Sequence, residues 1–124
     1  MPSEHKHISR AQNNEQFYSS FNLSTTPFID WAVTALFYSS LHYLDAYFAT
    51  YPAGGMHPHS HAARDFHVAR DSFTKNLYSS YRELKDRSED ARYNLISFNP
   101  TSVAILEIQD FQKIRNSIRG HLAL

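Results

Sequence analysis

The sequence predicts an all-α fold, an up-and-down antiparallel bundle of four to five helices. Apolar residues recur at helical spacing in the longest segments, and no stretch has the alternating pattern of a strand. The chain has only 3 Gly and 5 Pro in 124 residues, which suits long helices joined by few connections. With 42% hydrophobic residues, this length provides one domain over residues 1–124 but not two separate cores.

The first two helices are predicted before and after the break "NLSTTP". Residues 3–20 are polar with a weak apolar face, and Pro27 suits the first turn of the next helix. The segment 28–50 is apolar on nearly every side, as expected for the central helix of a bundle or one that also faces a second subunit. Its main face consists of Ile29, Val33, Leu36, Leu44 and Phe48.

The second half is predicted to hold two or three helices. Ser60 is a candidate N-cap after "YPAGGMHPH", and the helix it begins is expected to run on, with a kink, into residues 76–95. Asn99 is a candidate cap for the last helix, with Pro100 in its first turn. The buried positions expected in residues 76–95 are Leu77, Tyr81, Leu84, Ala91 and Leu95.

The last helix carries a cation on its apolar face. Arg115 falls in the same narrow helical sector as the apolar residues Ala104, Ile108, Phe111, Ile118 and Leu122. A buried unpaired guanidinium costs several kcal/mol, so two explanations arise. In the first, Arg115 lies near the helix C-terminus and its guanidinium extends to water. In the second, Arg115 faces a cleft or a subunit interface and binds an anion there, most naturally a phosphate group.

Two neighbours of Arg115 suit chemistry at a phosphate. His121 lies about 120° round the helix and offers an imidazole that exchanges protons near neutral pH. Asn116 offers a neutral donor and acceptor. A cation, an amide and an imidazole together suit phosphodiester cleavage without a metal.

Arg115, Asn116 and His121 resemble the R-N-x(n)-H motif in the last long helix of HEPN-domain proteins (higher eukaryotes and prokaryotes nucleotide-binding). The family allows four to six residues between its arginine and histidine, and this chain has five, "NSIRG". The stretches "DWAVTALFYSSLHYLDAYFA", "HPHSHAARDFHVAR" and "YRELKDRSEDARYNL" are similar, in the same order, to small prokaryotic members. The resemblance covers about residues 27–121.

The resemblance implies a HEPN-like bundle that forms a homodimer and needs no cofactor. Active members are metal-independent endoribonucleases, often toxins of toxin–antitoxin or phage-defence systems, whose site forms at the dimer cleft. Arg115 would then hold the scissile phosphate, His121 would assist the attack of the ribose 2′-hydroxyl or protonate the leaving oxygen, and Asn116 would orient the pair. The expected partners are RNA or a nucleotide, and a cognate antitoxin or nucleotidyltransferase.

Two other classes stay open. Many HEPN proteins do not cleave RNA and act instead as antitoxin-like, accessory or nucleotide-binding interaction modules. In a module of this class, Arg115 would bind the partner or the nucleotide. In the plainest case the chain is a structural dimerisation domain whose Arg115 only extends to water.

Four residues are candidates for supporting or binding roles. His42 and Asp45, one helical turn apart, form either a buried pair that orients Arg115 or His121, or an ordinary hydrogen-bonded core histidine. His61 and Arg64 are also one turn apart, with Arg64 expected to pair with Asp65 or Asp90 in a fixed ion-pair network.

No metal is expected at the histidine-rich stretch "HPHSH". His57, His59 and His61 alternate and His67 follows, but the spacing matches no established site and the nearest carboxylate is Asp65. Hydrogen bonds to the backbone are the expected role of His57 and His61.

The composition excludes several classes. Lys plus Arg and Asp plus Glu each number 12, so there is no basic excess for non-specific coating of nucleic acid. There is no cysteine, which excludes disulfides and thiolate chemistry. The N-terminus has no apolar leader and no apolar run spans a bilayer, so we expect a cytoplasmic protein without membrane contact.

Overall fold

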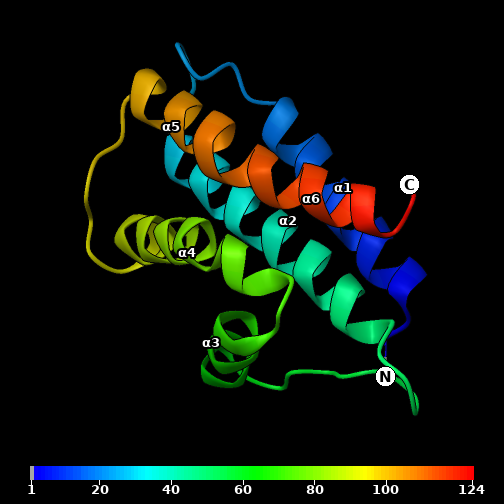
Figure 1. The fold of residues 1–124 in the computed structure, drawn as a ribbon. Helices are drawn as coiled ribbons and strands as arrows, with labels where there is room; N and C mark the ends of the chain where they lie inside the picture. The colour runs from blue at the N-terminus through cyan, green and yellow to red at the C-terminus, as the bar shows by residue number, and fades with distance from the viewer. Residues whose placement is uncertain (1) are drawn as a thin grey trace.

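The computed structural model describes residues 2–124 as a bundle of helices (Figure 1). No strand occurs in this range, so the predicted all-α bundle is confirmed. The elements are α1 (Glu4–Ser19), α2 (Ile29–Ala49), α3 (His61–Arg70), the 3-10 turn η1 (Thr74–Leu77), α4 (Tyr78–Arg92), α5 (Pro100–Leu106), the π-helical turn η2 (Glu107–Phe111) and α6 (Gln112–His121).

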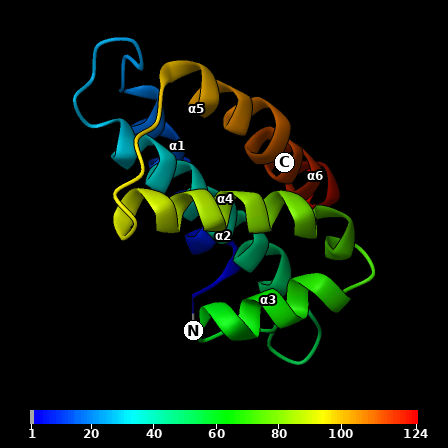
Figure 2. The same ribbon diagram turned by 90° about the vertical axis from the view of Figure 1, so that its left-hand side faces the viewer.

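Helix α2 is the centre of the bundle. The direction of the chain alternates along α1, α2, α4 and the continuous helix formed by α5, η2 and α6 (Figures 1 and 2). Helices α1, α4 and α6 all pack against α2, which explains why that segment is apolar on nearly every side. The short α3 lies beside the C-terminal half of α2, where the rings of Phe48 and His67 approach each other.

Local side chains fix the helix starts. The Ser60 hydroxyl accepts from the Ala63 amide at the start of α3. At the start of α5, the Asn99 side chain accepts from the Ser102 amide while Ser102 Oγ accepts from the Asn99 amide, which completes a capping box. Both predicted caps are therefore confirmed.

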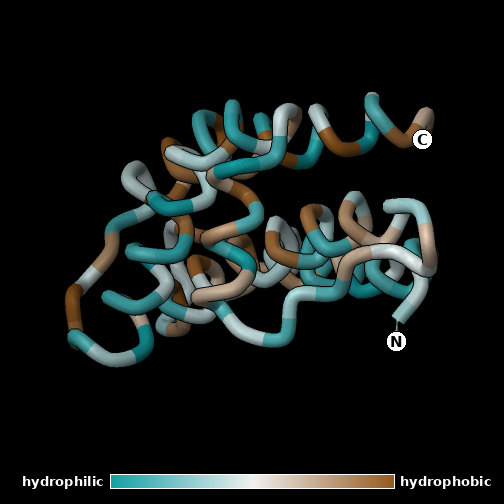
Figure 3. The backbone as a smooth tube through the Cα atoms, turned by 60° about the horizontal axis from the view of Figure 1, so that its bottom comes forward, coloured by the Kyte–Doolittle hydropathy of each residue, from teal (hydrophilic) through white to brown (hydrophobic). Residues whose placement is uncertain are grey.

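The predicted continuous helix through residues 61–95 is wrong, because Asp71 divides it. Asp71 has extended backbone (φ −66°, ψ 137°), and its carboxylate accepts from the amides of Phe73 and Thr74. The chain therefore turns and restarts through η1. Helix α4 ends at Arg92, three residues before the predicted end at Leu95. Leu95 lies in the connection that follows, where it is 89% exposed and has a φ of 55°. Figure 3 shows apolar positions on the outer turn of this connection.

The π-helical turn η2 changes which side of the last helix is buried. A π turn holds more residues than an α turn, so it shifts the phase of everything that follows. The buried positions are Val103, Leu106, Phe111, Ile114 and Ile118. Ile108, predicted to be buried, is 62% exposed because η2 faces it outward. The same shift moves Arg115 from the middle of the buried face to its edge, next to the buried Ile114.

None of the helices within residues 2–124 combines the length and the apolar character needed to cross a bilayer.

Candidate functional site: the α1–α6 groove and the Asp45–Arg64 cluster

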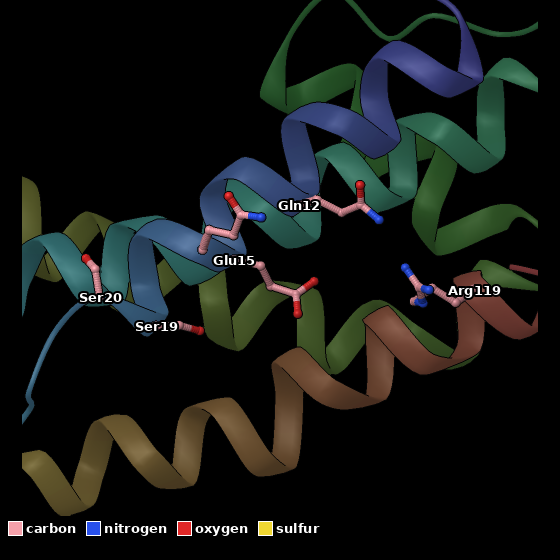
Figure 4. Close-up of a pocket in the computed structure, with 6 residues that line it drawn as sticks. Gln12, Glu15, Ser19, Ser20 and Arg119 are labelled. Atoms are coloured by element: carbon pink, nitrogen blue, oxygen red, sulfur yellow. The ribbon is translucent and has the colours of Figure 1, made fainter.

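A polar groove of about 590 Å³ runs between α1 and α6. Figure 4 shows Glu15 reaching from α1 toward α6, and Arg119 reaching back from α6. The rest of the lining consists of amide and hydroxyl side chains of α1 and its C-terminal end, Gln12, Gln16, Ser19 and Ser20. The groove thus offers many hydrogen-bonding groups and little apolar surface.

Arg115 lies next to this groove and is bound to Glu15, one of the residues that line it. Its Nη1 lies 3.1 Å from Glu15 Oε2, its Nε donates to Asn116 Oδ1 at 3.0 Å, and its guanidinium lies 5.6 Å from the centre of the Phe111 ring. The Arg115 side chain is 25% exposed. The cation therefore has a carboxylate partner on α1, and its place beside apolar residues carries no unpaired-charge penalty.

Glu15 joins Arg115 to the core of the bundle. Its other carboxylate oxygen accepts a hydrogen bond from the hydroxyl of Tyr43, which is fully buried on α2. Burial, reinforced by this bond, raises the pKa of Tyr43 to about 12. Tyr43 is therefore a permanent donor at neutral pH, and it holds the Glu15 carboxylate where Arg115 meets it.

His121 lies on another side of α6. Its ring stacks on Phe73, with centroids 4.5 Å apart, and makes an edge contact with Tyr47. Arg115 instead points toward α1, so the two predicted catalytic side chains do not converge within one chain. Asn116 is exposed and lies beside Arg115, as the sequence places it.

A second polar cluster is buried between α2 and α3. Arg64 Nε and Nη2 bind the two oxygens of Asp45 at 2.8 and 2.9 Å, and the two side chains are only 9% and 8% exposed. Burial alone lowers the pKa of Arg64, but the bonds and charge of Asp45 outweigh it and raise that pKa overall. Asp45 thus takes the role predicted for Asp65 or Asp90. Asp65 binds Arg82 and Lys85 instead, and Asp90 pairs with Arg87.

The two histidines of the predicted supporting set touch this cluster from different sides. His61 Nδ1 lies 3.4 Å from Arg64 Nη1, and burial followed by the charge of Arg64 lowers the pKa of His61. His42 Nδ1 lies 3.1 Å from His7 Nδ1 on α1. Burial, followed by the charge of His7, lowers the pKa of His42 to about 4. The hydrogen-bond partner of His42 is therefore His7, and neither Arg115 nor His121.

The structure adds three residues that sequence reasoning missed: Glu15, Arg119 and His7. All three depend on pairing α1 with α2 and α6, which no local pattern reveals. Arg119 alone had a local signal, because it follows Arg115 by four residues and so lies one turn away along the same helix.

The histidines of "HPHSH" do not gather at one point. His57 Nε2 donates to the Gly54 carbonyl oxygen at 3.0 Å, His61 faces Arg64, and His67 packs against Phe48 and Phe66. His59 is exposed. His57 thus has the backbone contact predicted for it, while His61 has a side-chain partner.

Searches against protein-family models, curated proteins and solved structures find no significant match to this chain.

Proposed function

We propose that this chain is a HEPN-like module that binds a phosphate of RNA or of a nucleotide in the α1–α6 groove and does not cleave it. The observation that carries the proposal is the placement of Arg115 and Arg119 one helical turn apart beside a groove lined by amides and hydroxyls. Guanidinium groups donate paired hydrogen bonds to phosphate oxygens, and neutral amides and hydroxyls contact phosphate and sugar without sequence preference.

Glu15 holds Arg115 in the absence of a ligand and competes with phosphate for it in this proposal. It fixes Arg115 through one oxygen and is itself fixed by Tyr43 through the other. Two arginines and one carboxylate leave a net positive charge at the groove. An arriving phosphate competes with Glu15 for the Nη groups of Arg115, while Arg119 lines the groove itself.

Absence of cleavage follows from the separation of Arg115 and His121. General acid–base catalysis requires an imidazole within hydrogen-bond reach of the reacting oxygen. The His121 ring packs against Phe73 and Tyr47, on a different side of α6 from the groove. A phosphate held by Arg115 in one chain therefore meets no proton-transfer group from His121.

The test is binding of a fluorescent single-stranded RNA, measured by anisotropy over a series of salt concentrations. Arg115→Ala and Arg119→Ala should each weaken binding about tenfold and lower the salt slope by about 1. Arg70→Ala is the matched control, because that arginine is on α3 and stacks on Phe66, away from the groove. Equal affinity of all four proteins, or no binding by the unaltered chain, would contradict the proposal.

A second candidate, the metal-independent endoribonuclease, is favoured by the outer side of the last helix. Ile105 and Ile108 are 47% and 62% exposed there, an apolar surface suited to a second copy of the chain. An isologous pairing along this helix is the arrangement that would bring Arg115 of one copy toward His121 of the other. Cleavage of single-stranded RNA in EDTA that is lost in His121→Ala, and kept in the exposed control His59→Ala, would establish this function in place of the first.

A further inference from the structure

The structure assigns a binding site for a divalent transition-metal ion to His7, His42 and Asp45, where α1 crosses α2. Each residue offers one ligand atom, and these three atoms lie within 4.8 Å of one another. The site is separate from the α1–α6 groove, and its metal need not take part in the function proposed there.

The spacing of the two imidazoles matches a metal chelate. His7 Nδ1 and His42 Nδ1 are 3.1 Å apart. In a tetrahedral zinc site with Zn–N bonds of about 2.0–2.1 Å, two nitrogen ligands are about 3.3 Å apart. The two atoms therefore need to move by only a few tenths of an ångström to bind the same ion.

Both imidazoles are held in place by the packing of α1 on α2. His42 is partly buried among the buried positions of α2. His7 is only 9% exposed, so its ring is fixed against α2 and cannot easily turn to solvent.

Asp45 retains acceptor capacity although it binds Arg64. Arg64 donates one hydrogen bond to each carboxylate oxygen, and each oxygen has a second lone-pair direction. The carboxylate also borders a cavity of about 110 Å³ together with His7, so that one of its sides is open to an ion. Neutralisation by Arg64 leaves a ligand set dominated by imidazole, which suits Zn²⁺, Ni²⁺ or Co²⁺ better than Mg²⁺ or Ca²⁺.

His57 lines the same cavity but lies outside the three-residue set, so its loop would have to move toward the ion for it to bind as a fourth ligand. Its Nε2 lies 3.0 Å from the Gly54 carbonyl, which can only accept, so Nε2 carries the proton and Nδ1 carries the lone pair. That Nδ1 is buried and has no hydrogen-bond partner among residues 2–124. A histidine whose second nitrogen donates to a backbone carbonyl is the usual arrangement of a metal ligand.

The loop that carries His57 is held closely against α2. The Met56 amide donates to the Phe48 carbonyl at 2.8 Å. Gly55 has a φ of 88°, and a Cβ there would lie 2.6 Å from the Ala49 carbonyl oxygen. This close approach brings the HPHSH stretch to the end of α2, where His7 and Asp45 lie.

The experiment uses the untagged full chain, freed of metal with EDTA and dialysed, and titrated with ZnCl₂ by calorimetry. We expect saturation at one ion per chain and a melting temperature that rises with Zn²⁺ concentration. His7→Ala should weaken binding at least about tenfold. His5→Ala should bind as the unaltered chain does, because that histidine is exposed on the same helix.

A spectroscopic readout keeps the test decisive if His7→Ala does not fold. Nitrogen-15 spectra of the unaltered chain should show zinc-induced shifts of the Nδ1 resonances of His7 and His42. No saturable binding, equal affinity of His7→Ala and the unaltered chain, or shifts confined to other histidines would each overturn the assignment.

Discussion

The bidentate pair between Asp45 and Arg64 supports a quantitative prediction about stability. Both side chains are more than nine-tenths buried, and they join α2 to α3. Asp45→Asn keeps the shape of the side chain but leaves the Arg64 guanidinium buried without a counter-charge. Removing one partner of a buried pair costs about 3–5 kcal/mol, whereas replacing both with apolar residues of similar volume is often neutral.

The two single variants and one double variant separate these effects. We expect Asp45→Asn and Arg64→Met each to lower the free energy of unfolding by about 3–5 kcal/mol. The double variant Asp45→Leu with Arg64→Met should lose less than either single variant. The double variant loses less because the loss of stability in each single variant comes from a buried charge without a partner, and not from a lost contact.

The assay is urea denaturation followed by far-UV circular dichroism, in buffer with a chelator so that metal does not contribute. A loss below about 1 kcal/mol for Asp45→Asn, the range of an exposed ion pair, would refute the reasoning. So would a double variant that loses the sum of the two single losses.

Three further predictions concern particular positions in the bundle. The pKa of Tyr43 is raised to about 12, so the unfolded chain ionises this tyrosine first, at about pH 10. Stability should therefore fall as the pH rises from about 10 to 12, by at most about 3 kcal/mol from this group, and urea denaturation should show a smaller fall in Tyr43→Phe. Gly55→Ala should destabilise the chain by about 1–3 kcal/mol because of its positive φ and the nearby Ala49 carbonyl. Gly120→Ala, in an open position of α6, should instead stabilise it by about 0.5–1 kcal/mol, and thermal melts of both variants check the contrast. Ile108→Ser should leave the stability of the single chain unchanged within about 0.5 kcal/mol, because the residue is exposed. Light scattering should find that the same variant dissociates the proposed homodimer, and a chain that is monomeric before the substitution would contradict that expectation.

The local features of the fold could be predicted from the sequence because they depend on neighbours in the chain. The apolar segment that becomes α2 and the caps at Ser60 and Asn99 are examples. The break at Asp71 also depends on local hydrogen bonds. It could not be predicted, because a single aspartate occurs inside helices as well as at their ends.

The phase of the last helix could not be predicted with a fixed helical period. Counting at 100° per residue places Ile108 and Arg115 on the same buried side. The π turn at Glu107–Phe111 inserts its extra residue between those positions, so Ile108 faces outward while Ile114 is buried. No residue type in "EIQDF" marks such a turn.

The candidate sites depend on pairings between distant parts of the chain. Glu15 and Arg115 are 100 residues apart, and His7 and His42 are 35 residues apart. Sequence reasoning identified Arg115, His42, Asp45 and Arg64 as unusual polar residues. It could not say which charge each one meets, because that follows only from the packing of α1 and α3 on α2.

The most direct test of the account is the RNA affinity of Glu15→Gln at constant salt. If the arginines of the α1–α6 groove bind phosphate, removing the carboxylate that competes for Arg115 should tighten binding several-fold, opposite in sign to the effect of Arg115→Ala. If Glu15→Gln binds RNA no better than the unaltered chain while it remains folded, Arg115 serves only to join α6 to α1, and the groove is not the phosphate site.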